Sequence, residues 1–215
     1  MYVLPALWFK NNWSWFPNKT KPSIKLAKEN DDIFTIQTKH PELEDMWFYC
    51  ESPRELLFTE NETNMNKLFG TKNTSDYVKD GINDYIVNGL KDSVNPEPEG
   101  TKFSPCYLMH FNPGESRELK FRLSKSKNLK TPFGKQFDEI FLSRENDADE
   151  FYKKVCNFPI EEDIRNIQRQ SFSGMLWAKQ FYNYVVEQWL EGDPTFPPPP
   201  EERKNGRNHN WTHLY

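Results

Sequence analysis

The sequence is poor in cysteine and contains no long apolar run. Its three cysteines, Cys50, Cys106 and Cys156, are too few and too far apart for a disulfide scaffold or a zinc finger. An odd number of widely spaced thiols favours a reducing compartment, hence the cytoplasm. No apolar stretch approaches the about 20 residues of a membrane span, and the first residues lack the features of a signal peptide. We therefore expect no membrane partner.

Positive charge is not in excess. The chain has 28 Lys and Arg against 32 Asp and Glu, a formal net charge of −4 at pH 7. Nucleic-acid binding requires a basic patch, and the sequence shows no Lys/Arg cluster that would supply one. We therefore expect no nucleic-acid partner.

The common catalytic and cofactor motifs are absent. There is no Gly-x-Ser-x-Gly and no Cys beside a plausible His partner, so nucleophilic catalysis is not indicated. Walker and dinucleotide glycine patterns are missing as well, and we expect no organic cofactor. His209 and His213 have the spacing of a helical metal pair, but no third ligand lies nearby, so we expect no metal. Acidic residues are abundant, yet spacing alone assigns none as acid or base.

Aromatic residues are plentiful, at 15% of the chain, and charged residues make up 28%. This composition is typical of a folded protein rather than a disordered one. Aromatic richness without basicity fits sugar recognition, because aromatic rings stack on the apolar faces of pyranoses. Most of these rings must nevertheless belong to the core.

Strand signals dominate before about residue 140. Short β-branched and aromatic runs predict strands at 33–36, 46–49 and 56–58. A hairpin is predicted from residues 107–111, through a turn at 112–115, into a strand in which Leu119, Phe121 and Leu123 face inward. One buried and one solvated face is typical of an antiparallel sandwich. Residues 1–140 are therefore predicted to form a β-sandwich region.

Helical periodicity follows. A short acidic-headed helix is predicted at 146–156, within a linker at 141–158. An apolar stripe then predicts one long helix from about 160 to 191, ended by Gly192 and Pro194. A proline run at 197–200 and a polar tail complete the region 159–215. A single long amphipathic helix is an incomplete layer that needs partners. The fold class is thus α+β.

Three segments are candidates for binding. On the long helix, Trp177 and Gln180 belong to a second, polar-aromatic stripe that could face a sugar; packing between two layers is the favoured alternative. In the tail, Asn210, Trp211 and His213 concentrate hydrogen-bonding groups and rings in a loop context. The polar cluster at 60–64 could line a pocket or form an ordinary loop with an Asx turn, and the loop is favoured.

Longer stretches resemble the bacterial and fungal glucosidase-like proteins of glycoside hydrolase family 63. The strongest match is RQSFSGMLWAKQFY at 169–182. Others lie, in order, at 2–9 with 13–15, 57–64, 77–80, 94–96, 144 with 148–152, 189–194, 197–200, 206–208 and 211–215. The matches span essentially the whole chain.

The resemblance implies a β-supersandwich domain followed by a six-hairpin (α/α)6 toroid, of which 159–215 would supply the first helix. It implies hydrolysis of α-glucosidic or related bonds with inversion, on an oligosaccharide or glucoside, without a metal or organic cofactor. Inversion needs a carboxylic acid and a carboxylate base roughly 6.5–9.5 Å apart. In the family the acid follows shortly after the segment matching 211–215, and the base lies further on.

No catalytic residue is therefore assigned to this chain, which is expected to be inactive alone and to need the downstream toroid of the same polypeptide. The family begins upstream of Met1, so Met1 is expected to be an internal methionine. One alternative is a non-catalytic carbohydrate-binding or scaffolding β-sandwich. Another is a trehalase-like or other six-hairpin enzyme, which differs only in substrate.

Overall fold

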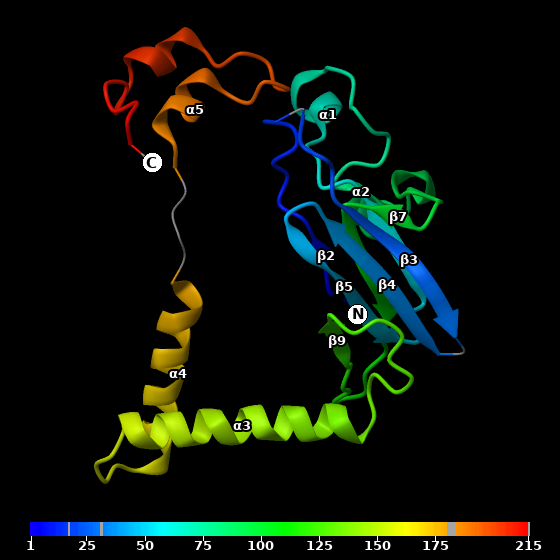
Figure 1. The fold of residues 1–215 in the computed structure, drawn as a ribbon, viewed down its shortest axis with the longest axis vertical. Coiled ribbons are helices and arrows are strands. Elements are labelled where there is room, and N and C mark those ends of the chain that lie inside the picture. The colour runs from blue at the N-terminus through cyan, green and yellow to red at the C-terminus, as the bar shows by residue number, and fades with distance from the viewer. Residues whose placement is uncertain (17, 31, 180–183, 215) are drawn as a thin grey trace. The chain divides into compact units, whose positions relative to one another are not determined.

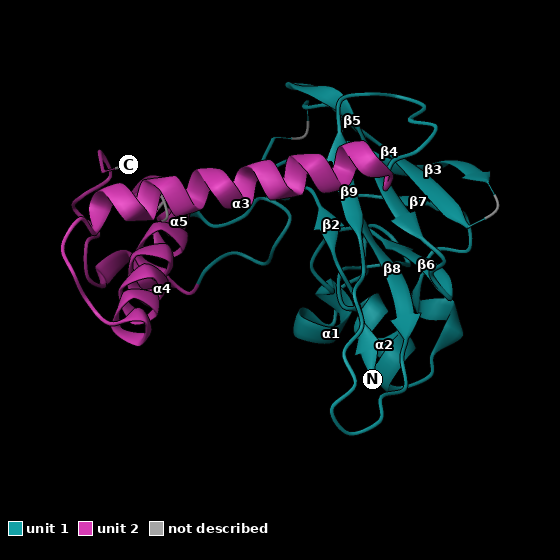
Figure 2. Ribbon diagram, turned by 90° about the horizontal axis from the view of Figure 1, so that it is seen from below, with its two compact units in different colours: residues 1–132, 191–199 teal, residues 133–190, 200–215 magenta. Residues whose placement is uncertain are grey.

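The computed structural model describes residues 1–16, 18–30, 32–179 and 184–214 (Figure 1). These residues form two compact units (Figure 2). Unit 1 comprises Met1–Pro132 and Glu191–Pro199, and unit 2 comprises Phe133–Leu190 and Pro200–Tyr215. Both sheets lie in unit 1, whereas the long helices lie in unit 2.

The larger sheet of unit 1, counted over the described residues, has five antiparallel strands in the order β7-β3-β4-β5-β9. They are β3 (Ser23–Asn30), β4 (Ile33–His40), β5 (Leu43–Glu51), β7 (Glu99–Gly100) and β9 (Phe121–Ser124). Alternation along β4 turns Phe34 and Ile36 toward the core and leaves Ile33 and Thr35 on the other face. The strands predicted at 33–36 and 46–49 are confirmed.

The smaller sheet is built around β8 (Lys102–Leu108). It also contains β1 (Tyr2–Val3), β2 (Leu7–Trp8) and β6 (Glu55–Thr59), all antiparallel to β8, and β6 confirms the strand predicted at 56–58. The chain passes from β7 in one sheet to β8 in the other at Thr101. Gly100 is required at this crossing, because a Cβ atom there would lie 2.4 Å from the carbonyl oxygen of Thr59.

The two sheets share one core. Its buried residues are Ile24, Ile36, Phe48 and Cys50 from the larger sheet and Phe58 and Phe103 from the smaller one. The rings of Phe48 and Phe103 meet edge to face across the sheets, with centroids 5.8 Å apart. The other face of the smaller sheet is covered by α2 (Gly81–Val87) and the 3-10 turn η1 (Lys91–Ser93), through Leu57, Ile82, Val94 and Cys106. The α+β class with two antiparallel sheets is thus confirmed.

Unit 2 contains α3 (Lys135–Val155), α4 (Glu162–Ala178), α5 (Val186–Glu191) and the 3-10 turn η2 (Glu201–Asn205). Tyr152 of α3 and Ser173 of α4 share a hydroxyl hydrogen bond of 2.7 Å. Arg169 forms an ion pair of 2.5 Å with Asp149. Neither α3 nor α4 contains a buried residue, so polar surface contacts hold them together. No helix within the described ranges is long and apolar enough to cross a membrane.

The predicted hairpin at 107–123 is wrong. β8 ends at Leu108, and β9 pairs with β5 of the other sheet, with Phe121 opposite Cys50. Phe121 faces inward and stacks on Phe48 at 5.9 Å, but Leu123 is 47% exposed. The segment joined the strand that offered its aromatic side chain a buried partner, and sequence proximity to β8 did not decide the pairing.

The helix boundaries also differ from those predicted. α3 begins at Lys135, after Gly134, rather than at 141 or 146, and the first segment of unit 1 runs to Pro132. The single helix predicted from 160 to 191 is wrong, because α4 ends at Ala178 and residues Tyr184 and Val185 are not helical. Aromatic and β-branched residues favour helix weakly, and a helix whose apolar stripe has no packing partner gains little stability to offset this.

Candidate functional site

Unit 1 contains a pocket of about 560 Å³. Segments far apart in the sequence form its walls, including Asn11 and Trp13, Glu62 and Thr63, and Phe196 from the returning segment Glu191–Pro199. An adjoining recess of about 210 Å³ shares Asn11, Thr63 and Phe196 with it. The pocket lies beyond the end of β6, where α1 (Met65–Phe69) begins.

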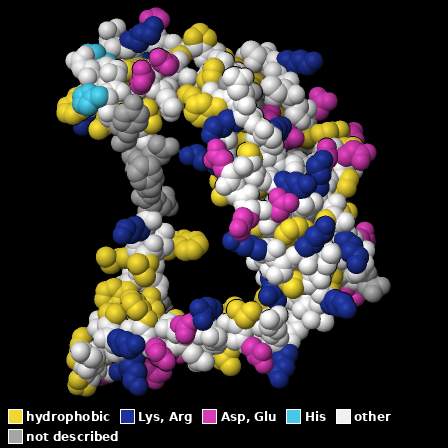
Figure 3. All heavy atoms as spheres, viewed as in Figure 1, with side chains coloured by type: hydrophobic (Ala, Val, Ile, Leu, Met, Phe, Trp, Pro, Cys, Tyr) yellow, Lys and Arg dark blue, Asp and Glu magenta, His cyan; other side chains and the backbone are white. Residues whose placement is uncertain are grey.

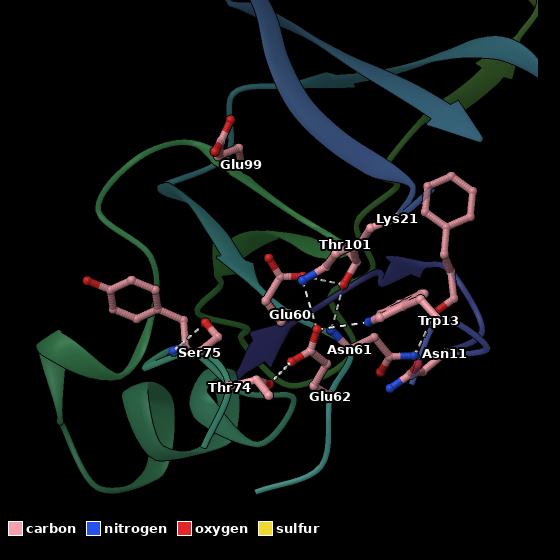
Figure 4. A network of polar contacts seen from close by, with 12 residues as sticks. Asn11, Trp13, Lys21, Glu60, Asn61, Glu62, Thr74, Ser75, Glu99 and Thr101 are labelled. Carbon is pink, nitrogen blue, oxygen red and sulfur yellow. Dashed lines mark hydrogen bonds and ion pairs between the residues drawn. The ribbon is translucent and has the colours of Figure 1, made fainter. Parts of the chain in front are cut away.

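The Glu62 carboxylate organises one side of the pocket (Figure 4). Its Oε1 accepts hydrogen bonds from Trp13 Nε1 at 2.9 Å and from Lys21 Nζ at 2.7 Å, and its Oε2 accepts one from the Thr74 hydroxyl. Burial alone would raise the pKa of Glu62, but these hydrogen bonds outweigh burial and hold the pKa below its ordinary value. Glu62 is therefore a fixed anion at neutral pH, with no proton to give.

Lys21 links Glu62 to a second carboxylate. Its Nζ also lies 3.0 Å from Glu60 Oε2 and sits over the Trp13 ring, 5.7 Å from the centroid. Burial lowers the pKa of Lys21, but the two carboxylates more than compensate, so the pKa is raised. Glu60 Oε2 also accepts a hydrogen bond of 2.6 Å from the Thr101 hydroxyl. The network fixes the Trp13 ring by a hydrogen bond at its edge and a cation over its face.

The segment Glu191–Pro199, here called the strap, forms the opposite wall. Asp193 Oδ1 accepts hydrogen bonds from the backbone N–H and the hydroxyl of Thr195, and its Oδ2 accepts one from Ser14 at 3.3 Å. This turn places Phe196 in the pocket wall, with its ring 5.5 Å from that of Phe69. Gly192 has a φ of 84°, and a Cβ atom there would lie 2.6 Å from Pro199 Cγ, so the strap requires glycine.

The side chains of this pocket are suited to binding a ligand rather than to catalysis. Two aromatic rings, a fixed carboxylate, the ammonium group of Lys72 and several neutral polar groups line the pocket, and together they suit a hydroxylated ligand with an apolar face. Glu60 and Glu62 share one ammonium group, so they do not form the separated pair of an inverting site. Among the described residues, no cluster of three or more His, Cys, Asp or Glu could hold a metal ion. Burial raises the pKa of the Cys50 thiol to about 12, so it stays protonated and is no nucleophile.

The residues predicted to bind substrate all belong to unit 2, and among the described ones a ring contact joins only Trp211 and His213. The rings of Trp211 and His213 stack with centroids 5.8 Å apart, and Asn210 beside them is exposed. Trp177 projects from α4 with 89% of its surface exposed, so it is not part of a core formed by the described residues. Gln180 lies outside the described residues.

Sequence reasoning missed the pocket in unit 1. The cluster at 60–64 was expected to be an ordinary loop, but Glu62 and Thr63 line the pocket, and Asn64 accepts a hydrogen bond from Lys67 N as the N-cap of α1. A dense polar cluster directly after a buried strand was the available signal. No local pattern indicated that Trp13 and Phe196 would converge on it.

Comparison with known proteins gives one relative to report. No family model matches the chain, and no solved structure matches it. The Saccharomyces cerevisiae protein named Uncharacterized protein YMR196W is 37% identical over 249 aligned residues. The match takes in the whole of this chain and 23% of the relative, so the chain corresponds to a minor part of that protein's length.

Proposed function

We propose that the chain is part of a glycoside hydrolase that cleaves α-glucosidic or related bonds with inversion, in which unit 1 binds sugar and supplies neither catalytic acid nor base. The pocket formed by Trp13, Glu62 and Phe196 carries this proposal. Rings stack on the apolar faces of a pyranose, and Glu62, which accepts three hydrogen bonds within the chain, retains an acceptor site on Oε2 for a sugar hydroxyl. The resemblance of the sequence to family 63 suggests the reaction class.

The absence of an assigned catalytic residue follows from the chemistry of inversion. One group must carry a proton to the leaving oxygen, and another must take a proton from water. Glu62 is held ionised by its ion pair and hydrogen bonds, and Glu60 binds the same Lys21. In this proposal these residues orient the sugar, and the acid and base lie in other parts of the longer polypeptide. No metal or organic cofactor takes part.

The exposed face of α4 supports the larger architecture of the proposal. On this face Ile164, Ile167 and Met175 are more than half exposed, and so are Leu176 and Trp177, which lie on other sides of the helix. Figure 3 shows hydrophobic side chains gathered over this helix. We propose that further helices of the same polypeptide cover this face in a six-hairpin toroid. Trp177, Gln180, Asn210, Trp211 and His213 would then contribute to the substrate site.

The binding test uses the 215-residue chain and glucose disaccharides of each α-linkage, measured by calorimetry. We expect saturable binding of at least one disaccharide, weakened about tenfold by Trp13→Ala because the stacking surface is lost. Trp8→Ala is the matched control, since Trp8 is 54% exposed and does not line the pocket. Absence of binding, or equal weakening by both variants, would contradict the proposal.

The catalytic test uses the same chain with aryl α-glucosides. We expect no hydrolysis above the blank. Turnover that is abolished by replacing an acidic residue of this chain, for example Glu60→Gln, would show that the chain holds its own catalytic carboxylates.

A non-catalytic carbohydrate-binding or scaffolding role is the second candidate. It is favoured by unit 1 having its own two-sheet core and its own pocket. The two candidate functions predict different exposure of the α4 side chains in the longer polypeptide. A scaffold would not need further helices on the α4 face, so adding the remaining polypeptide would leave Trp177 as exposed as it is in this chain.

A further inference from the structure

A second pocket, independent of the proposed sugar site, lies on the outer face of the larger sheet. It has a volume of about 420 Å³ and is lined by Lys28 and Asn30 of β3, Ile33 and Thr35 of β4, and Asn128 and Lys130 of the loop after β9. Because Phe34 and Ile36 face the core, Ile33 and Thr35 point away from it. The pocket therefore shares no wall with the core of unit 1.

Three features of the backbone shape this pocket. The register of β3 shifts between Leu26 and Lys28, and such a bulge re-aims the side chains that follow it. Asn128 has a φ of 60°, a left-handed conformation that few residues other than glycine adopt. The hydroxyl of Tyr49, a residue only 1% exposed, donates to Ser126 O at 2.8 Å and accepts from Leu129 N at 3.3 Å. A buried tyrosine thus anchors the loop onto the sheet.

The charges in the pocket have one sign. Its described lining includes two ammonium groups and no carboxylate. Neither Lys28 nor Lys130 forms an ion pair with a carboxylate of the described residues. By contrast, two flanking lysines are paired, Lys25 with Glu99 and Lys125 with Glu44. In a chain of net charge −4, two such lysines face one concave site, and none of the described carboxylates forms an ion pair with either of them.

We propose that this pocket binds a small organic anion through a phosphate or carboxylate group. The ammonium groups of Lys28 and Lys130 would hold the oxyanion, while the amide of Asn128 and the hydroxyl of Thr35 would bind hydroxyls of the ligand. Ile33 and Leu129 supply an apolar floor. The volume is in the range of small-molecule sites and is too small for a polymer to enter.

The test is an NMR titration of the isotopically labelled 215-residue chain with inorganic phosphate and, separately, with acetate. We expect saturable shifts of the amides of Lys28, Asn128 and Lys130 with at least one of the two anions. Tighter binding of phosphate assigns a phosphoryl ligand, and tighter binding of acetate assigns a carboxylate ligand. Shifts that do not saturate, or that are spread over the surface, would overturn the proposal.

Variants separate this site from general surface charge. Lys28→Gln with Lys130→Gln is expected to weaken anion binding about tenfold or more, because two charge-assisted hydrogen bonds are lost. Lys39→Gln is the control, since Lys39 lies on β4, is exposed and does not line the pocket. It should change the affinity by less than about twofold, as expected of an exposed and screened charge. Equal weakening by the control would overturn the proposal. The titration of the unaltered chain tests the proposal even if a variant fails to fold.

Discussion

The two units bury their apolar side chains in opposite ways. Among the described residues, thirteen of the fifteen buried hydrophobic residues lie in unit 1, and the two in unit 2 are Cys156 and Val186. In unit 1, the two sheets cover each other's inner faces, and a helix covers the outer face of the smaller sheet. In unit 2, α3 and α4 have amphipathic sequences but no buried residue. Paired sheets can complete a core by themselves, whereas a few helices with exposed stripes cannot.

The largest expected effect tests this contrast directly. Phe103 is fully buried between the sheets, so Phe103→Ala should lower the free energy of unfolding by about 3–5 kcal/mol. Trp177→Ala, which removes a larger ring from α4, should change it by less than about 0.5 kcal/mol because Trp177 is 89% exposed. Urea unfolding measures both. A large effect of Trp177→Ala would show that α4 is packed in solution.

The next effect concerns the ion pair between Glu62, which is largely buried, and Lys21, whose side chain is 39% exposed. Glu62→Gln should destabilise the chain by about 2–3 kcal/mol at pH 7, because charged hydrogen bonds from Lys21 and Trp13 are weakened. Glu42→Gln is the control, since Glu42 is exposed and its ion pair with Lys19 lies on the surface; no measurable loss is expected. Comparable losses of stability in both variants would show that Glu62 contributes no more than a carboxylate in a surface ion pair.

The same carboxylate predicts a dependence on pH. The pKa of Glu62 is lower in the folded chain than its ordinary 4.5, so its stabilisation is complete above that value and is lost as pH falls through the folded pKa. Lys21 has a raised pKa, so its contribution is lost only when pH rises beyond its ordinary 10.5. The acid loss should be smaller in Glu62→Gln. An unchanged acid profile in this variant would show that other carboxylates are responsible.

Replacing a glycine with alanine is expected to have smaller effects on stability, and these effects have opposite signs in the two units. Gly192→Ala should cost about 1–2 kcal/mol in strap docking, because its φ is positive and the new methyl meets Pro199. Limited proteolysis within 191–199 should become faster. Gly174→Ala on α4 meets nothing within 4 Å and should instead stabilise the helix by about 0.5–1 kcal/mol. If Gly192→Ala left proteolysis unchanged, the strap would not depend on this glycine.

The smallest expected effect on stability comes from substitutions that reduce the exposed apolar surface of α4. Ile167→Ser with Met175→Ser should reduce the binding of an apolar dye while the free energy of unfolding changes by less than about 1 kcal/mol, because both side chains are more than half exposed. Leu43→Ser, on unit 1 and also exposed, is the control and should leave dye binding nearly unchanged. Dye binding that responds only to the control would place the exposed apolar surface on unit 1.

Much of the fold was predictable because it depends on local periodicity. The strands at 33–36, 46–49 and 56–58 follow from β-branched and aromatic runs, and the presence of helices after about residue 140 follows from helical periodicity and charge placement. Errors arose where a distant partner decided the outcome. Phe121 paired with β5 because Phe48 offered it a buried face. The helix predicted to reach 191 was interrupted because its apolar stripe has no described partner.

The candidate sites show the same division. The sequence by itself determined that the chain folds, that strands dominate its first part and long helices follow, and that a polar cluster follows β6; it did not indicate α1 and α2, which lie between strands. Only the tertiary structure decided that Trp13, Glu62 and Phe196 line one pocket, or that Lys28 and Lys130 face another. The physical reason is range: side-chain periodicity acts over a few residues, whereas a binding site depends on contacts between segments that the sequence separates widely.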